Sequence, residues 1–442
     1  MFQFFPSTFF NFEFTRVLGT IPFGGAELAE CLDAAANIVN DDPESWHQAW
    51  LTQARKAEAL ATDALAYGDK IAAREAFLRA SNYFRASQYM FNDRPDTPDP
   101  RVKQFFARSV AAFRQALPFF EHQSHLLRIS YRDDVHLQGY LFIPDSSQLA
   151  SASFPIVICC GGADSTSEEL YFLFGASGCK RNYAVVLFDG PGQGHSLREQ
   201  KLTMRPDWES LTTPVLDYIC KLAEQNPQWS LDTSRIALAG VSMGAYYALR
   251  GAVDPRVKAC VSIDPFYDMF DLATSRMPPW FIRSWLAGWI SDGMFNATWA
   301  TLSRFNYQLK WELTHVMWIF GQPSAAAAMR EMRRYTLDVG DDREQYLRRV
   351  KCPVLVSGAA HTIYTAPEIS TMRVKQALDH LPDDKRQVWI AREPGDGGLQ
   401  GKVGAWRLLQ QRMFQFLGDQ LEVQQGPGGE GKPQPVDTLV DV

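Results

Sequence analysis

The spacing of hydrophobic and polar residues divides the chain into a helical first part and a second part of short apolar runs. Residues 43–120 place apolar side chains at helical intervals in three stretches, separated by turns rich in Gly, Pro and Asp. This pattern predicts a helical N-terminal domain that serves packing and carries no chemistry of its own. From about residue 126 the helical spacing gives way to short β-rich runs. The first two, HLLRISYRD and VHLQGYLFIP, predict a hairpin that opens a sheet.

Six continuous apolar runs follow the hairpin and are mostly separated by helical stretches. Strands that are apolar at every position are buried on both faces, which is typical of a parallel sheet covered by helices. The sequence therefore predicts an α/β fold. The six runs are 154–162, 183–192, 235–244, 257–265, 352–360 and 386–394.

A helical insertion at residues 266–345 separates the fourth of these runs from the fifth and holds six of the twelve tryptophans. An insertion there lies above the carboxyl ends of the strands, where α/β proteins bind ligands. We therefore expect a helical lid whose tryptophans line an apolar cavity. The alternative is that they pack the lid against the N-terminal helices. The tryptophans expected to bind substrate are Trp280, Trp285, Trp289 and Trp299.

The first residues are unusually aromatic, because seven of the first 14 are Phe. Such a segment must pack on the body, on a subunit partner or over a ligand, since it would aggregate if exposed. Packing on a subunit partner predicts a homodimer. The resulting domain division is an N-terminal helical domain at 1–125, an α/β core at 126–265 and 346–420, a lid at 266–345 and a disordered Gly/Pro-rich tail at 421–442.

Composition narrows the class of function. The 442 residues are 46% hydrophobic and 21% charged with a formal net charge of -6, and no Lys/Arg block occurs, which disfavours nucleic acid or an anionic membrane surface as partner. No run of 18 apolar residues predicts a membrane span, and the N-terminus has no basic segment typical of a secretory signal. The seven scattered cysteines lack metal-binding spacing, so we predict a reduced, cytoplasmic protein without metal or cofactor.

One motif carries recognisable chemistry. Gly240-Val241-Ser242-Met243-Gly244 follows an apolar strand and opens a helix, which is the context of a nucleophile elbow. In that turn the Ser242 hydroxyl is exposed at the top of the sheet, and the Met243 N–H is free to stabilise an oxyanion. The alternative is a tight strand-to-helix turn without chemistry.

A second oxyanion donor is expected from the turn after the run 154–162. Gly162 and Ala163 lie there, and glycine lets a backbone N–H approach a reacting oxygen. Asp164 follows in the same turn. It is either a catalytic carboxylate or the cap of the helix that begins at STSEELYF.

Four segments, in this order and spacing, resemble the α/β-hydrolase superfamily: GGADSTSEELYF, FDGPGQGHS, GVSMGA and CPVLVSGAA. The branch most like this chain is that of the fungal polyketide-pathway hydrolases, which includes pigment polyketide-shortening enzymes and fusarin and cytochalasan pathway hydrolases. The bacterial dihydroxypseudooxynicotine hydrolase is a distant relative. The segment FFNFEFTRVLGTIPFGGAE is most similar to the fusarin and cytochalasan members. The resemblance covers about residues 10–420 and implies an α/β-hydrolase fold with a mostly parallel sheet, a helical N-terminal domain and a helical lid.

The catalytic triad of this fold is incomplete in the sequence. The residue after CPVLVSGAA, where the acid normally lies, is His361, and the loop after the last strand, EPGDGGLQGKVGAW, contains no histidine for the base. A rearranged set of Ser242, His361 and Asp264 is one interpretation, with His361 as base and Asp264 orienting it. The other interpretation of His361 is a structural hydrogen bond from a loop.

The resemblance also implies a substrate. Fusarin and cytochalasan pathways release a linear polyketide–amino acid aldehyde, which closes to a pyrrolinone by intramolecular Knoevenagel condensation. An oxyanion hole stabilises an enolate as well as a tetrahedral intermediate, and an aromatic lid excludes water, so a condensing enzyme acting on a hydrophobic polyketide is favoured. Two alternatives stay open: a serine hydrolase that cleaves a C–C, ester or thioester bond through Ser242, and a protein that only binds an intermediate.

Overall fold

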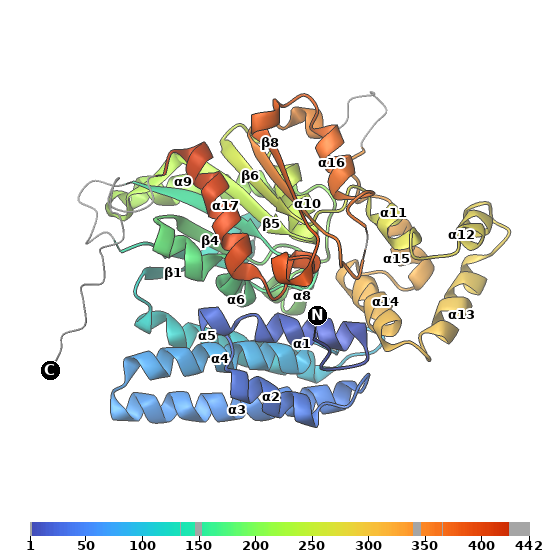
Figure 1. The fold of residues 1–442 in the computed structure, drawn as a ribbon, viewed down its shortest axis with the longest axis horizontal. Helices are drawn as coiled ribbons and strands as arrows, with labels where there is room; N and C mark the ends of the chain where they lie inside the picture. Colours follow the sequence, from blue (N-terminus) through green and yellow to red (C-terminus); the bar gives the residue numbers. More distant parts are fainter. Residues whose placement is uncertain (1, 133, 146–152, 339–345, 365, 424–442) are drawn as a thin grey trace, which may run out of the picture.

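One eight-stranded sheet forms the centre of the protein in the computed structural model, which describes residues 2–132, 134–145, 153–338, 346–364 and 366–423 (Figure 1). The strand order is β1-β2-β4-β3-β5-β6-β7-β8. The hairpin strands β1 and β2 are antiparallel and β2 is antiparallel to β4, whereas the other pairs are parallel. The predicted hairpin and the mostly parallel α/β sheet are thus confirmed. The strands are β1 Gln123–Arg132, β2 Val135–Ile143, β3 Phe154–Cys160, β4 Ala184–Phe188, β5 Leu231–Val241, β6 Val257–Ile263, β7 Val354–Ala359 and β8 Arg386–Ala391.

Alternate side chains of the central strands enter two separate cores. On β3, Ile156 and Ile158 lie in a core with helices α9 (Glu209–Gln225) and α10 (Met243–Gly251), whereas Val157 faces the other core with α17 (Trp406–Leu421). Both faces of the sheet are therefore covered, which accounts for strands that are apolar at every position.

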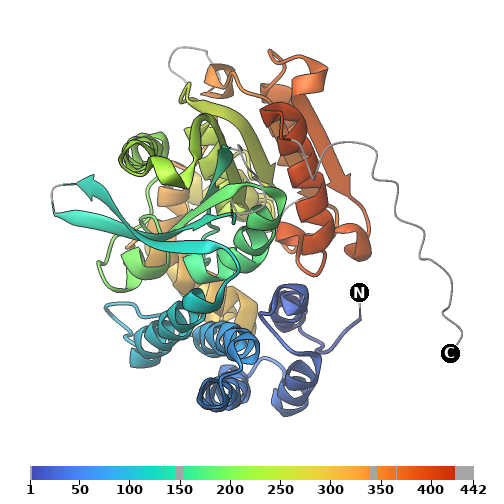
Figure 2. The same ribbon diagram turned by 90° about the vertical axis from the view of Figure 1, so that its left-hand side faces the viewer.

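Five helices form a layer beneath the edge of the sheet that carries the candidate site (Figures 1 and 2). They are α1 Thr8–Leu18, α2 Leu28–Asn37, α3 Pro43–Tyr67, α4 Lys70–Gln88 and α5 Pro100–Ala116. The long helices α3 and α4 are separated by Gly68, whose φ of 89° ends α3, and by Asp69, whose carboxylate accepts hydrogen bonds at the start of α4.

The Phe-rich segment packs on the body of this chain. Phe10 and Phe14 of α1 are fully buried, and their rings lie 5.2 and 5.7 Å from those of Trp46 and Trp50 on α3. Of the three arrangements that the sequence left open, the structure therefore realises packing on the body.

The insertion after β6 forms five helices, of which α12 and α13 project away from the rest of the molecule (Figure 1). They are α11 Met269–Thr274, α12 Pro279–Leu286, α13 Asp292–Leu302, α14 Tyr307–Ile319 and α15 Ala325–Met332. Unlike α12 and α13, α14 is held by the N-terminal layer. Trp311 Nε1 donates to the Tyr89 carbonyl at 2.9 Å, and the Tyr307 hydroxyl donates to the Met90 carbonyl at 2.8 Å.

Two further predictions concern membrane-spanning helices and the end of the chain. Within the described residues, no helix combines the length and the apolar character needed to cross a bilayer. The predicted tail at 421–442 falls mostly outside the described residues, which end at position 423.

Candidate active site

The turn around Ser242 has the strained geometry of a nucleophile elbow. Ser242 lies between β5 and α10 with φ 56° and ψ −116°, and its N–H donates to the Ile263 carbonyl at 2.8 Å. A Cβ on Gly240 would lie 1.9 Å from the Gly244 carbonyl oxygen, and a Cβ on Gly244 would lie 2.0 Å from the Cys160 oxygen. Both glycines of the motif are therefore required for the backbone to pass so closely.

The turn after β3 faces the elbow and is fixed by a glutamine. Gln193 Nε2 donates to the carbonyls of Gly161 and Gly162 at 2.6 and 3.0 Å. The Gly162 N–H donates to Ser165 Oγ at 3.0 Å, so the prediction of Gly162 as an oxyanion donor is wrong: its proton is already engaged. In the described part of the chain, the N–H groups of Ala163 and Met243 meet no acceptor. These two remain the candidate oxyanion donors.

A largely apolar cavity lies between this edge of the sheet and the lid. The sheet contributes Ala163, Asp164, Ser242, Met243 and Asp264 to its wall. The lid contributes mainly apolar side chains, which include Met269, Leu272, Met277, Leu309, Trp311, Leu313, Val316, Ile319 and Phe320. Among the described residues, no group of His, Cys, Asp or Glu side chains has a geometry that would hold a metal ion.

The four tryptophans expected in this wall lie elsewhere, so that prediction is wrong. Trp285 and Trp299 pack on Phe295, with ring centres 4.4 and 5.8 Å away, inside the projecting α12–α13 hairpin. Trp280 and Trp289 are 63% and 83% exposed. The reason is geometric, because the hairpin points away from the sheet, and its buried aromatic residues extend the main hydrophobic core outward and do not line the cavity. The wall instead contains Trp311, on the helix that the N-terminal layer holds.

The structure also does not assemble Ser242, His361 and Asp264 into a triad. The His361 side chain is 52% exposed, lies 4.0 Å from a carboxylate oxygen of Glu393 and is absent from the cavity wall. The chain turns outward after β7, and the His361 N–H donates to the Gly398 carbonyl at 2.8 Å. His361 is therefore wrongly placed to act as a base on Ser242.

Asp264 holds a loop instead of a histidine. Its carboxylate accepts from the Ser357 hydroxyl at 2.7 Å, from the Gly401 N–H at 2.8 Å and from Lys402 Nζ at 2.8 Å. Burial lowers the pKa of the Lys402 ammonium, and the Asp264 carboxylate opposes that effect. This buried ion pair places Gln400 in the cavity wall, where Gln400 Nε2 donates to the Asp264 carbonyl at 3.2 Å. The loop that would carry a catalytic base thus presents an amide.

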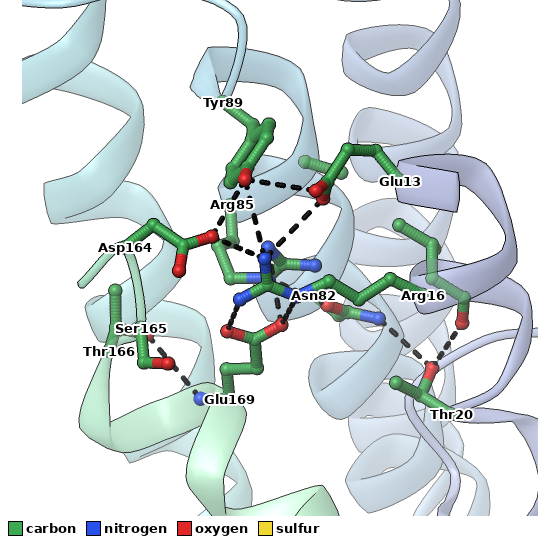
Figure 3. A network of polar contacts seen from close by, with 12 residues as sticks. Glu13, Arg16, Thr20, Asn82, Arg85, Tyr89, Asp164, Ser165, Thr166 and Glu169 are labelled. Atoms are coloured by element: carbon green, nitrogen blue, oxygen red, sulfur yellow. Dashed lines mark hydrogen bonds and ion pairs between the residues drawn. The ribbon is translucent and has the colours of Figure 1, made fainter. Parts of the chain in front are cut away.

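Asp164 is engaged by residues from the N-terminal layer (Figure 3). The Arg16 guanidinium of α1 binds Asp164, and the Tyr89 hydroxyl donates to the same carboxylate oxygen at 2.7 Å. Burial alone would raise the pKa of Asp164, but Arg16 outweighs it and holds that pKa well below its usual range. Thr166, whose hydroxyl accepts from the Glu169 N–H at 3.4 Å, caps the following helix, so the interpretation of Asp164 as the cap is wrong.

His315 is the histidine that reaches the cavity wall, and the sequence analysis missed it. Its Nδ1 lies 3.1 Å from Asn92 Oδ1 and its Nε2 lies 3.4 Å from the Ala163 carbonyl. Burial lowers the pKa of His315 to about 4, although the Asp164 carboxylate opposes this, so the ring is neutral at pH 7. The available signal was the spacing of Trp311, His315 and Trp318, which puts a polar group on one aromatic face of α14.

Comparisons with known proteins agree with this fold. The family described as esterase FrsA-like matches residues 30–281. The hydrolyase poxO of Penicillium oxalicum is 48% identical over 96% of this chain and 100% of its own length. The 20-hydroxy-prefusarin hydrolase FUS2 of Gibberella moniliformis is 43% identical over 94% of this chain and 97% of its own. The solved 2,6-dihydroxy-pseudo-oxynicotine hydrolase has a TM-score of 0.69 at 20% identity, covering 91% of this chain and 95% of that one, which supports the fold alone.

The close approach at the elbow predicts that Gly244→Ala is severely destabilising. The new Cβ would meet the Cys160 backbone at 2.0 Å, so we expect the free energy of unfolding to fall by at least about 3 kcal/mol. The matched control is Gly293→Ala in α13, whose Cβ would meet nothing closer than 3.7 Å and which should stay within about 1 kcal/mol of the wild type. Urea denaturation followed by circular dichroism measures both, and equal stability of the two variants would contradict the geometry.

The buried ion pair gives a second prediction. Lys402→Met leaves the Asp264 carboxylate buried without its cation, and we expect a loss of about 3–5 kcal/mol in unfolding free energy. Adding Asp264→Asn to Lys402→Met should restore part of that loss, because no charge is then left unpaired. Asp383→Asn, which breaks the exposed pair with Arg386, should cost less than about 1 kcal/mol in the same denaturation assay. A Lys402→Met loss no larger than this control would show that the pair does not hold the loop.

Proposed function

The chain belongs to the FrsA-like family of α/β-hydrolase-fold enzymes, and we propose that it acts on a polyketide intermediate of fungal secondary metabolism. The proposed reaction is the intramolecular Knoevenagel condensation of a linear polyketide–amino aldehyde to a pyrrolinone. Two fungal relatives, one named a hydrolyase and the other a 20-hydroxy-prefusarin hydrolase, support the substrate class. The wall of the cavity supports the reaction.

The observation that carries this proposal is Gln400 in the place of a base. Serine hydrolysis requires a histidine that takes the Ser242 proton, and in a serine protease its loss costs on the order of 10⁶ in turnover. Here the loop after β8 contributes an amide to the wall, and Asp264, which would orient such a base, is neutralised by Lys402. The oxyanion donors of Ala163 and Met243 are retained without the group that activates a nucleophile.

His315 is the base in the proposed reaction. Asn92 Nδ2 donates to Thr314 Oγ1 at 3.0 Å, which turns the amide oxygen of Asn92 toward His315 Nδ1. A neutral ring carries one N–H, and its shorter polar contact is to Asn92, so we assign the proton to Nδ1. Nε2 then carries the lone pair, and because the Ala163 carbonyl oxygen 3.4 Å away is an acceptor that cannot bond it, that lone pair stays available to a substrate proton. A carbon between two carbonyls can be deprotonated by a weak base once the oxyanion donors hold the enolate oxygen.

The proposed condensation has two stages, ring closure and loss of water. Nε2 of His315 takes a proton from the carbon between the two carbonyls, and the enolate oxygen accepts hydrogen bonds from the two backbone N–H groups. The carbanion forms a C–C bond to the aldehyde carbon, and the alkoxide that results takes the proton back from His315. Loss of a second proton from the same carbon and of the hydroxyl group as water gives the double bond of the ring.

The cavity suits this chemistry in polarity and size. Its wall is mainly apolar, and its volume of about 180 Å³, with about 70 Å³ in a second lobe, is below the roughly 300–1,000 Å³ typical of sites that enclose a drug-sized ligand. We expect it to receive the ring-forming end of the substrate and to exclude water from it, with the remaining chain extending past the lid helices. Exclusion of water favours condensation over hydrolysis.

A second candidate is hydrolysis of a C–C, ester or thioester bond with His315 as the base for Ser242. The observation in its favour is that both residues lie in the wall of one cavity, and the similar protein FUS2 is named a hydrolase.

Product mass separates the two reactions. When the wild-type protein is incubated with a polyketide–amino aldehyde, we expect a product lighter than the substrate by one water. Products that together contain one added water would establish hydrolysis and contradict the condensation.

His315→Gln should lower the turnover by roughly 10²–10⁴-fold, as loss of a general base does. His361→Gln, outside the cavity, should keep the wild-type rate. Equal effects of the two variants would reject His315 as the base.

Reactivity of Ser242 gives an independent prediction. A fluorophosphonate probe should label the wild type slowly, because no base activates the hydroxyl, and Ser242→Ala should not be labelled at all. Gln400→His places an imidazole in the cavity wall beside Asp264, and we expect it to accelerate labelling, whereas Gln400→Asn should not. Rapid stoichiometric labelling of the wild type would show that Ser242 is already an activated nucleophile, which would favour hydrolysis.

A further inference from the structure

Glu13 lies in the wall of a second lobe of the active-site cavity, on the side away from the lid. The lobe lies between α1 and the sheet, and its wall includes Phe12, Glu13 and Arg16 from α1. It shares Asp164, Ser242, Tyr364 and Gln400 with the main cavity. A carboxyl group of the N-terminal helix thus lines a pocket whose wall includes Ser242, whereas His315 lines the main cavity.

The hydrogen bonds around Tyr89 require a proton on Glu13. The Tyr89 hydroxyl lies 2.7 Å from Asp164 Oδ2 and 3.0 Å from Glu13 Oε1, yet it has one proton to donate (Figure 3). Asp164 is held ionised by Arg16 and takes the shorter bond. The contact to Glu13 is satisfied only if the Glu13 carboxyl O–H donates to the Tyr89 oxygen.

The balance of charge leads to the same conclusion. The guanidinium of Arg16 binds both oxygens of Glu169 at 2.6 and 2.5 Å, and Arg85 lies 3.4 Å from Glu169. Arg16 also lies 3.4 Å from Glu13 Oε2, but the two cations already face the two carboxylates of Asp164 and Glu169, and an ionised Glu13 would add a third. The charged or titratable groups that face Glu13 are Arg16, Arg85, Tyr89, Asp164, Glu169 and Tyr364. Burial raises the pKa of Glu13 to about 7, against the opposing effect of Arg16.

We infer that Glu13 is the general acid that protonates the departing hydroxyl group when the condensation product loses water. The inference rests on the proposed condensation and adds the group that its last step needs. His315 and Glu13 lie in the walls of different lobes, which meet at Ser242 and Asp164. One side of the reacting centre would take protons and the other would give them.

His315 and Glu13 supply the two proton transfers of the dehydration. His315 Nε2 removes the remaining proton from the carbon between the carbonyls, the electron pair forms the C=C bond, and the C–O bond to the hydroxyl breaks. The Glu13 O–H turns from the Tyr89 oxygen to the departing hydroxyl group and transfers its proton to that oxygen, which leaves as water. His315 is then protonated and Glu13 ionised, and one proton exchanged through solvent on product release restores both.

Glu13→Gln tests this role directly. The amide keeps the size of the side chain and can still donate to the Tyr89 oxygen, but it cannot transfer a proton. We expect dehydration to slow by roughly 10²–10⁴-fold, with accumulation of the ring-closed hydroxy adduct, which has the mass of the substrate but a different retention time. The matched control is Glu168→Gln. Glu168 is equally buried, its pKa is likewise raised by burial to about 7, and it accepts from Tyr140 at 2.6 Å outside both lobes. The control should give the dehydrated product at the wild-type rate.

The wild-type protein provides a test that depends on no variant. The rate of dehydration should fall tenfold per pH unit above about pH 7, as Glu13 loses its proton, and the hydroxy adduct should accumulate there. Glu13→Gln should lack this alkaline limb, whereas Glu168→Gln should retain it. A wild-type product ratio that does not change between pH 6 and 9, or dehydration by Glu13→Gln at the wild-type rate, would overturn the inference.

A measurement without substrate separates this inference from the proposed function. The infrared band of protonated carboxyl groups should be present in the wild type at pH 6, diminish toward pH 9, and be smaller in Glu13→Gln than in the wild type by the contribution of Glu13. A wild type that condenses while Glu13→Gln leaves this band unchanged would overturn the role of Glu13 alone. A wild type that adds water to its substrate would reject the condensation itself, and the role of Glu13 with it.

Discussion

The buried guanidinium of Arg16 is the interaction on which the arrangement of the site depends. Removing a guanidinium from water is costly unless carboxylates surround it closely, and here Glu169 binds it through both oxygens while Asp164 binds a third nitrogen. Those carboxylates come from the turn and helix that follow β3, which are also the elements that carry the oxyanion donor. Arg16 thereby fixes the N-terminal helix against the reacting centre and fixes the charge of Asp164.

The helical layer contributes polar side chains to the site as well as packing. It supplies Glu13 and Arg16 from α1, and Tyr89 and Asn92 from the end of α4 and the segment that follows. The same segment holds the lid helix α14, since Tyr89 and Met90 accept hydrogen bonds from it. The cavity therefore has three walls from three parts of the chain, and only one of them is the hydrolase sheet. In the proposed reaction, titratable groups from the other two walls act in place of a histidine on the β8 loop.

The sequence predicted the features that depend on residues close together in the chain. Continuous apolar runs predicted six of the eight strands, and the glycines around Ser242 predicted the elbow, because both depend on near neighbours in the chain. The functional partners of Asp164 could not be predicted in this way. Arg16 and Glu13 stand among phenylalanines, where the pattern indicates packing, and the density of tryptophans in the lid did not reveal that α12 and α13 project away from the sheet.

The contacts of Arg16 also constrain the order of events during synthesis. Its partners Asp164 and Glu169 lie 148 and 153 residues further along the chain, so α1 emerges from the ribosome long before the groups that neutralise it exist. Helix α3, on which Phe10 and Phe14 pack, is available soon after α1, but the guanidinium lacks these two carboxylates until the turn and helix after β3 have formed. The ion pairs of α1 are therefore completed late, by a non-local folding event.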